Sequence, residues 1–312
     1  MKKKSNNNIL IAGVITVIIV GGGILAATQD WKSGRNGLVD YARAEMGDAG
    51  LQYELGVKAR DSKAPGEGPE KAAKWFEKSA AAGNVQAMLA LGDLYNAQSD
   101  EASGDAAVKW YRKASDAGNM DATVRLGEAY DMGRGSLVPD RHKSRPLFEK
   151  AAKAGNPEGE NLFGSVLLQE SAFGDAAARE KKLKEAETWL LRASKDGNAQ
   201  ADGTLGNIYY DTHSPLKDMD KAFYHYSRAC NGGMWPVMLN LAYMHLNGVS
   251  TKKDPAEAYK WILLEADMQP REMRTALAFL RAELSPAELA DGVKRAAAWR
   301  KAHPDYKAPE HA

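Results

Sequence analysis

The reactive side chains of this chain are few and scattered. It has one cysteine, Cys230, so it can form no internal disulfide, CxxC redox pair or cysteine-rich zinc site. Its six histidines stand far apart, at 142, 213, 225, 245, 303 and 311. No HExxH, GxSxG or GxxxxGK[ST] motif occurs, and no EF-hand spacing. We therefore expect no catalytic residues, no metal site, no cofactor and no enzymatic activity, and we look to the elements of the fold for a binding function.

Composition indicates an ordinary globular chain with balanced charge. The 312 residues include 42 Lys+Arg and 41 Asp+Glu, for a formal net charge of +1. Apolar residues make up 44% and charged residues 27%, which argues against wholesale disorder. Nucleic-acid binders show a basic excess or stripe, and this chain has none. We expect no nucleic-acid partner.

The first thirty residues predict where the chain is located. Lys2, Lys3 and Lys4 form a basic stub, residues 1–8, ahead of an uncharged segment, residues 9–27. As a helix this segment is about 28 Å long, which just spans a bilayer core of about 30 Å. Either it is retained as a single-pass signal anchor, or it is a signal peptide that is cleaved. The positive-inside rule places residues 31–312 in a bacterial periplasm, tethered to the inner membrane or soluble after cleavage.

The rest of the chain repeats with a period of 35 to 42 residues. The alignment rests on one glycine in each unit: Gly83, Gly118, Gly155, Gly197 and Gly233. A large residue stands eight positions before it: Trp75, Trp110, Leu147, Trp189 or His225. A small residue stands four after it, a Leu-Gly pair eight and nine after it in most units (Gly92, Gly127 and Gly206), and a tyrosine twelve after it. A sixth unit has Trp261 in register and Gln269 in place of the glycine, and a degenerate unit around Gly47 precedes the first.

Each repeated position has a physical reason. Apolar residues ahead of the glycine recur at helical spacing, and the glycine supplies the left-handed residue that ends a helix. The small residue at +4 and the glycine at +9 mark where the second helix passes close to the first. The tyrosine at +12 presents its ring to the next layer and its hydroxyl to a loop. Each unit is therefore a helical hairpin whose apolar face is buried only by stacking on its neighbours.

This pattern resembles the Sel1-like repeat family, an α/α solenoid related to tetratricopeptide repeats. The motif KAxxW(F/Y)xKAAxxGNxxAxxxLGxxY is clearest in Glu70 to Tyr95 and Ala106 to Tyr130. Leu284 to Trp299 resembles the capping helix that ends such arrays. The resemblance implies an all-α, right-handed superhelical solenoid of six to seven units over residues 38–300, with its cap at 286–301. Residues 28–37 are then a linker and 302–312 a flexible tail.

Departures from the motif are local and imply weaker packing at single joints. The third unit has Leu147 for tryptophan and Gly159 for alanine, and the fifth has His225 and an unusual Gly232–Pro236 segment. Two stretches are interpreted as loop insertions, residues 97–105 and 169–183. They are either extra length that the fold tolerates or segments that contact a partner. Residues 61–69 read as a loop between the degenerate unit and the first full one.

Recurring positions favour packing, and variable positions favour binding. Trp75, Trp110, Trp189 and Trp261 recur in register, so a core role is the simpler interpretation. His225 and His245 either fill aromatic slots or act as a ligand or pH sensor, and Cys230 reads as a small buried residue. Trp235, with Met234 and Met238, is either a binding hot spot or a cover over a bent joint. First helices line the inner face of such solenoids, and the residues there that could contact a partner are Lys74, Lys78, Lys109, Arg112, Tyr224, Arg228 and Lys260.

The balanced, repeat-built surface predicts protein–protein recognition. The resemblance implies the same, since these arrays are described as adaptors in signalling and complex assembly. We expect a membrane-tethered periplasmic scaffold that docks an envelope protein on its concave face and assists an envelope complex, for example a secretion apparatus. The alternative is a module that binds peptidoglycan or glycan fragments through exposed tryptophans. Nothing in the sequence indicates the oligomeric state.

Overall fold

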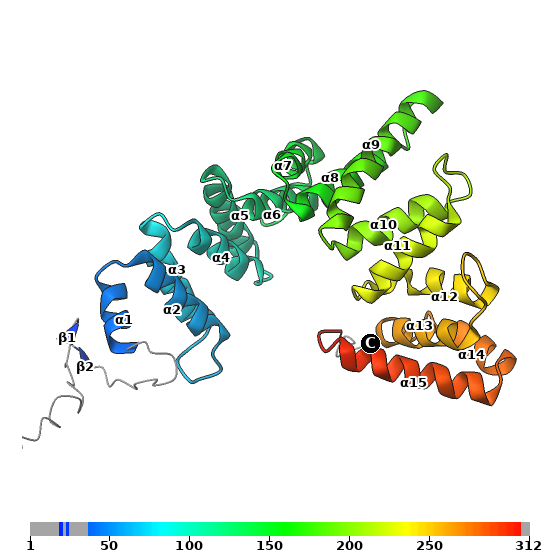
Figure 1. Cartoon of the computed structure of the whole chain (residues 1–312). Helices are drawn as coiled ribbons and strands as arrows, with labels where there is room; N and C mark the ends of the chain where they lie inside the picture. The colour runs from blue at the N-terminus through cyan, green and yellow to red at the C-terminus, as the bar shows by residue number, and fades with distance from the viewer. Residues whose placement is uncertain (1–18, 21–22, 25–36, 307–312) are drawn as a thin grey trace, which may run out of the picture. The chain divides into compact units, whose positions relative to one another are not determined.

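The computed structural model describes residues 19–20, 23–24 and 37–306 (Figure 1). The chain divides into two compact units, with the boundary between Pro139 and Asp140. Two short strands, β1 (Ile19–Val20) and β2 (Gly23–Ile24), pair antiparallel. Every other regular element of the described residues is a helix.

The predicted membrane segment, residues 9–27, lies outside the described residues apart from those two strands. In the part of the chain that the structure describes, no helix is both long and apolar enough to cross a bilayer. The anchor and its cleavage therefore stay predictions. The basic stub at 1–8 and residues 28–36 of the linker also lie outside the described residues.

The first unit contains three helical hairpins. Its helices are α1 (Gly37–Glu45), α2 (Ala49–Asp61), α3 (Pro69–Ala81), α4 (Val85–Asn96), α5 (Glu101–Asp116) and α6 (Met120–Met132). Each helix packs against the one before it and the one after it. The degenerate unit around Gly47 is thus a real hairpin, α1 and α2. Residues 62–68 form the connection predicted between α2 and α3.

The second unit contains further helical hairpins and ends with the predicted capping helix. It contains α7 (Arg141–Lys153), α8 (Pro157–Glu170), α9 (Ala176–Lys195), α10 (Ala199–Tyr210), α11 (Met219–Asn231), the 3-10 turn η1 (Trp235–Val237), α12 (Met238–Asn247), α13 (Pro255–Met268), α14 (Arg274–Glu283) and α15 (Pro286–Ala302). The predicted cap is α15, which packs on α13. Ser285 and Glu288 start it with a reciprocal capping box.

The hairpin turns confirm the role of the aligned glycines. Gly83, Gly118, Gly155, Gly197 and Gly233 all have φ between +77° and +92°. An asparagine follows the first four, and its side chain accepts a hydrogen bond from a backbone N–H of the next helix: Asn84, Asn119, Asn156 and Asn198. Met234 replaces it in the fifth hairpin, so the second helix there begins with η1 and has no side-chain cap.

The +4 and +9 positions contact different helices. A Cβ at Gly159 would lie 2.5 Å from Ala151 Cβ, so +4 does face the first helix of its own hairpin. The prediction that the +9 glycine also faces the first helix of its own hairpin was wrong. Gly92 of α4 faces the ring of Tyr111 in α5, and Gly206 of α10 faces Tyr226 in α11. The large residue seven before the next glycine fills the space that +9 leaves, so this position joins successive hairpins.

The tyrosine at +12 also differs from expectation. Tyr209 donates its hydroxyl to Glu187 in α9 at 2.6 Å, and Tyr95 reaches Glu77 in α3 at 3.4 Å. Tyr130 instead accepts from Arg112 in α5 at 2.5 Å. In each case the partner is a side chain on the first helix of the same hairpin, not a loop. These bonds tie the two helices of a hairpin together near its open end.

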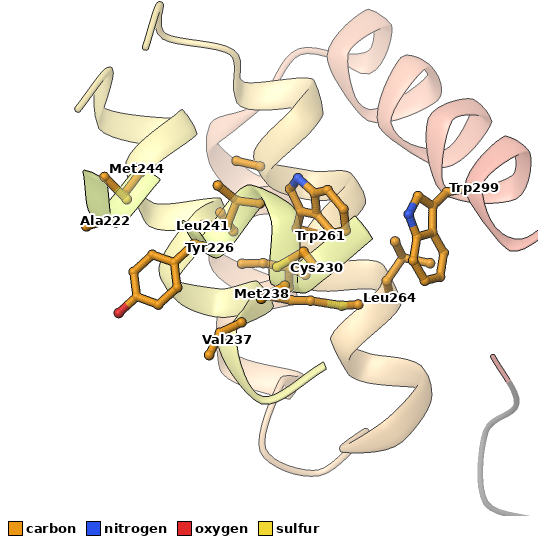
Figure 2. Close-up of a cluster of buried hydrophobic side chains, with 14 of the residues drawn as sticks. Ala222, Tyr226, Cys230, Val237, Met238, Leu241, Met244, Trp261, Leu264 and Trp299 are labelled. Carbon is orange, nitrogen blue, oxygen red and sulfur yellow. The ribbon is translucent and has the colours of Figure 1, made fainter. Parts of the chain in front are cut away.

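The core of the second unit runs from α9 to α15 without interruption. Figure 2 shows Cys230 inside it, beside Trp261 and Met238. Cys230, Tyr226 and Met238 are fully buried, which confirms Cys230 as a small core residue. The chain beyond α15 is not wholly a flexible tail. Residues 303–306 pack against this core through Tyr306, while 307–312 lie outside the described residues.

Candidate functional site

The aligned tryptophans pack between helices, and a basic side chain lies over the ring of most of them. Trp75 and Trp261 are buried, whereas Trp110 and Trp189 are half-buried. A basic side chain three positions on covers the ring: Lys78 over Trp75 at 4.4 Å, Lys113 over Trp110 at 4.2 Å, and Arg192 over Trp189 at 4.5 Å. These stacked pairs hold the long basic side chains against the helix surface.

Four of the predicted binding residues lie on α3 and α5 of the first unit. Lys74 and Lys109 are exposed. Lys78 is engaged twice, over Trp75 and in an ion pair with Glu45 at 2.8 Å. Arg112 is exposed and holds the Tyr130 hydroxyl. Lys74 and Lys109 are therefore the freer of the four, and Lys78 and Arg112 also brace their hairpins.

Lys260 is not available to a partner. Lys260 is buried, and its ammonium lies 2.5 Å from Glu257 and 3.6 Å from the Trp261 ring centroid. Arg295 of α15 binds Glu257 at 3.0 Å and Asp254 at 2.8 Å. Lys260 and Arg295 of α15 therefore share Glu257 as a partner where α13 and α15 pack together.

Tyr224 and Arg228 form the most organised exposed pair. Both lie on α11, and the Tyr224 side chain is 54% exposed. Arg228 Nη1 donates to the Tyr224 hydroxyl at 3.1 Å, and its guanidinium lies 5.6 Å from the Tyr224 ring centroid. The edge of His225 meets the same ring at 5.0 Å. These contacts hold the tyrosine ring in one orientation.

A buried carboxylate from the preceding hairpin fixes this pair. Asp202 of α10 is 2% exposed. It accepts from Arg228 Nε at 3.1 Å, from His225 Nδ1 at 2.7 Å and from Ser194 Oγ at 2.7 Å. Arg228 also donates to the Ser194 carbonyl. A buried carboxylate needs such donors, and here they come from both α9 and α11.

The arrangement does not activate a nucleophile. Ser194 Oγ and His225 Nδ1 both donate to Asp202 Oδ1, so the imidazole does not accept the Ser194 proton as it would in a Ser–His pair. His225 stacks on Tyr209 at 5.6 Å and fills the slot that tryptophan holds in other repeats. His245 is half-buried against Phe223, and burial lowers its pKa. In the described residues no group of His, Cys, Asp and Glu could hold a metal ion.

Trp235 and its neighbours pack where the turn after α11 meets α10 and the core. Met234 packs its Sδ against Gly203 of α10, where no Cβ would fit. Trp235 is half-buried against the core, and Met238 is fully buried. This geometry favours the interpretation of Trp235 as a cover.

The insertion at 169–183 is a helix extension rather than a loop. Residues 176–183 form the first two turns of α9, which has 20 residues where the other first helices of the hairpins have 9 to 16. A pocket of about 530 Å³ lies between this extension, the end of α8 and the 211–215 turn. Its apolar floor includes Leu168, Leu183 and Ile208. Likewise, residues 101–105 of the stretch 97–105 form the start of α5.

A family model for the Sel1 repeat matches residues 49–84, 85–119, 121–156, 205–234 and 235–267. These segments make up more than half of the chain. The chain belongs to the Sel1 repeat family. The family's repeat unit pairs the second helix of one hairpin with the first helix of the next. Gly92 and Tyr111 therefore lie within one Sel1 repeat, as do Gly206 and Tyr226. The unmatched residues 157–204 contain α8 and the elongated α9.

Solved structures share the Sel1 repeat fold at low identity. A protective antigen present in uropathogenic Escherichia coli, which displays an SLR fold, matches with a TM-score of 0.60 and 19% identity over 86% of this chain. The match spans 64% of that protein. A Sel1 repeat protein from Oxalobacter formigenes matches with a TM-score of 0.60 and 22% identity, over 70% of this chain and 88% of that one. No curated protein matches. Sel1 repeat proteins are generally protein–protein interaction scaffolds and are typically not catalytic.

Sequence reasoning found Tyr224 and Arg228 but missed the residue that organises them. Asp202 stands five after its aligned glycine, where the other units have Met88, Thr123, Glu160 and Met238. The available signal was an acid at a position where two other units have methionine, although Glu160 shows that Asp202 is not the only acid there. Its partners could not be identified, because they come from two different helices, α9 and α11.

Proposed function

We propose that this chain is a membrane-tethered periplasmic scaffold that docks an envelope protein through the exposed side chains of its first helices. Residues 9–27 are the tether, held by Lys2, Lys3 and Lys4 on the cytoplasmic side. Residues 31–312 carry 39 basic and 40 acidic residues, so no bulk charge attracts phosphate or anionic lipid to them. Recognition then rests on particular side chains.

The observation that carries the proposal is the Tyr224–Arg228 pair. Tyrosine and arginine are enriched among residues that dominate binding energy at interfaces. Tyr224 is exposed yet fixed by Arg228 and His225, so little side-chain entropy is lost when a partner covers it. The buried Asp202 holds Arg228 from beneath. Pre-organisation of this kind is typical of a binding surface.

Crosslinking in living cells tests this proposal. A photoreactive residue replaces Tyr224, and a second variant carries it at the exposed Lys301 at the end of α15 as a matched control. We expect one envelope protein to be trapped at position 224 and not at 301, and Arg228→Glu to abolish the trapping. Trapping of nothing, or of the same mixture at both positions, would overturn the docking surface.

The tether needs its own experiment, since the docking surface does not depend on it. Intact mass measurement of the chain purified from membranes reports whether residues 1–27 are retained. A reporter active only outside the cytoplasm, fused after Tyr306, reports the side of the membrane. An inactive reporter rules out the periplasmic assignment.

The glycan alternative relied on exposed tryptophans, and the described residues offer none. Sugars stack on open aromatic faces, and every tryptophan in the described residues is buried or half-buried. Sedimentation of the chain with purified peptidoglycan remains its direct test. Saturable binding there, together with no protein trapped at Tyr224, would reverse our order of preference.

A further inference from the structure

The first helices of two successive hairpins, α7 and α9, carry an excess of positive charge. α7 has five lysine or arginine residues and one acid, and α9 has six against three. α8, which packs against both, has three acids and no basic residue. Residues 31–312 as a whole are nearly neutral, so this excess is local. It is also not a feature of every repeat, since α5 has three residues of each sign.

The acids nearest to these cations are already shared between them. Glu149 of α7 binds Arg145 at 3.0 Å and Lys153 at 2.6 Å. Glu170 of α8 binds Arg145 at 2.9 Å and also Lys182 of α9. The hydrogen bond from Lys153 lowers the pKa of Glu149. Burial opposes the ionisation of Glu170, yet hydrogen bonds from Lys182 and Arg145 lower its pKa. Each carboxylate thus serves two cations, and none is left for the others.

Several cations of α7 and α9 have no acidic partner. Lys150 of α7 and Lys181 and Lys195 of α9 are exposed and form no ion pair within the described residues. Arg192 is exposed as well, and it lies over the Trp189 ring at 4.5 Å. Together with two exposed lysines that are paired on their own helices, they make up the basic face: Lys150, Lys153, Lys181, Lys184, Arg192 and Lys195. The summed field of such a face attracts negative groups.

The basic face adjoins the Tyr224 surface. Arg228 of α11 donates to the carbonyl of Ser194 in α9, so the two helices meet at this point. Lys150, Arg192 and Arg228 stand at one repeat position, five before the aligned glycine. Because equivalent positions of stacked hairpins face the same way, these three cations form a row across α7, α9 and α11.

The composition of the basic face favours a protein over a lipid bilayer. A helix that lies on a membrane combines its basic residues with a broad apolar face. On α7 and α9 the only large apolar side chain that is exposed is Leu191, at 41%. Sel1 repeat proteins generally act as scaffolds for protein–protein interactions. The chemistry that this face complements is therefore an acidic stretch of polypeptide.

We propose that the basic face binds an acidic segment of the partner protein, whose carboxylates pair with Lys150, Arg192 and Lys195 while Tyr224 and Arg228 hold the adjoining residues. The inference rests on the proposed docking function and adds the chemistry of the partner to it. Complementary charge speeds encounter and selects an acidic partner over a neutral or basic one. Exposed charges are screened by salt, so this contribution weakens as ionic strength rises.

Peptide binding to the purified full chain, held in a non-ionic detergent, tests the basic face. The probe is a short fluorescent peptide that alternates glutamate with serine, and its control has glutamine in place of glutamate. We expect saturable binding of the glutamate peptide and none of the glutamine peptide. The affinity should fall at least about tenfold between about 50 mM and about 300 mM salt. Equal binding of the two peptides would contradict the proposal.

Charge reversal locates the binding. The triple change Lys150→Glu, Lys181→Glu and Lys195→Glu should weaken binding of the glutamate peptide at least about tenfold. The matched control alters net charge equally at three exposed lysines elsewhere in the second unit: Lys252→Glu, Lys294→Glu and Lys301→Glu. It should change the affinity by about twofold or less. Glutamine at the first three positions keeps the test open if the reversed chain folds poorly, and should give a smaller loss in the same direction.

Three outcomes would overturn the acidic partner. One is equal affinity of the two triple variants for the glutamate peptide. Another is tighter binding to vesicles that contain phosphatidylglycerol than to the peptide, which would assign the face to anionic lipid. The third is self-association of the chain that the changes at 150, 181 and 195 abolish, which would make a second copy the occupant.

Crosslinking in cells separates this inference from the docking function itself. With the photoreactive residue at position 224, the triple reversal on α7 and α9 should abolish trapping of the envelope protein. Trapping that persists unchanged would overturn the acidic partner and leave the docking function standing. Peptide binding that depends on the basic face, with nothing trapped at position 224 in the unreversed chain, would support the face and overturn the docking function alone.

Discussion

The ring of Tyr226 lies directly over the Cα of Gly206. A Cβ at Gly206 would come within 2.5 Å of Tyr226 Cε1, well inside van der Waals contact. The ring cannot swing aside, because Tyr226 is fully buried and its hydroxyl donates to Asn207 at 2.8 Å. The same contact recurs between Gly56 and Phe76 and between Gly92 and Tyr111. These three pairs of successive hairpins therefore touch through one glycine and one ring, and Gly164 faces Leu190 in the same way.

Gly206→Ala should lower the free energy of unfolding by about 2 kcal/mol, because the added methyl overpacks a ring that has nowhere to move. Urea unfolding followed by circular dichroism measures this. Gly50→Ala is the matched control. It lies in the first turn of α2 with only Asp48 Oδ1 within 4 Å, at 3.5 Å, so it should cost nothing or stabilise slightly. Equal effects of the two changes would contradict the contact.

Asp202→Asn should destabilise the second unit by about 3 kcal/mol, because it removes the charge that His225, Arg228 and Ser194 all hold. The same change at the exposed Asp220 is the control and should shift stability by about 0.5 kcal/mol or less. Asp202→Asn should also weaken any binding at Tyr224, since Arg228 loses its anchor. Unfolding at an unchanged urea concentration would show that the network contributes little.

Glu265→Gln should remove a pH dependence of stability. Glu265 is 3% exposed, its Oε2 has no partner, and burial raises its pKa to about 7 from a usual 4.5. The folded state therefore binds the proton more tightly than the unfolded state. The resulting stability is fully present below about pH 4.5 and is lost as pH rises through about 7, by up to about 3 kcal/mol.

Unfolding of the unmodified chain and of Glu265→Gln at a series of pH values measures this loss. The exposed Glu283→Gln is the control and should keep the wild-type slope. The prediction fails when the wild-type chain loses no stability between about pH 5 and pH 8, or when Glu265→Gln loses as much.

Cys230 should not react with thiol reagents in the folded chain. It is fully buried, and burial raises the pKa of its thiol far above the usual range, so almost no thiolate forms. A colour reagent for thiols should therefore report one reactive group only after denaturant is added. Rapid labelling of native protein would mean that the core around Trp261 opens.

The hairpins, their turns and the capping helix could be predicted from the sequence, because each follows from local periodicity and from glycine at a left-handed position. Gly92 shows where that reasoning ends. Periodicity identifies a position that needs a small residue, but not which neighbouring helix comes close. The partner proved to be Tyr111 of the next hairpin. The helical extension of α9 was missed because its added length was interpreted as loop, although Ala, Arg, Glu and Lys favour helix.

The burial and hydrogen-bond partners of individual side chains were harder to predict than the helices. Lys260 occupies a repeat position that is exposed in the other units, yet it is buried on α13, a helix that packs against both α12 and α15. His303 left no signal in the sequence at all, because its partners are backbone carbonyls that any residue supplies. Interactions with the backbone of a distant segment cannot be predicted from residue types.

The residues three before and five after each aligned glycine form a pair whose residue types differ from one hairpin to the next. The pairs are Ala80 and Met88, Ser115 and Thr123, Ala152 and Glu160, Ser194 and Asp202, and Cys230 and Met238. Because Asp202 reaches forward to His225 and Arg228, the fourth hairpin and the fifth are matched to each other. Recombination between similar repeats readily deletes or duplicates one unit. In this chain a deletion of the hairpin formed by α9 and α10 would leave Arg228 facing Glu160 on a longer side chain, without Ser194, so the hairpins are not interchangeable.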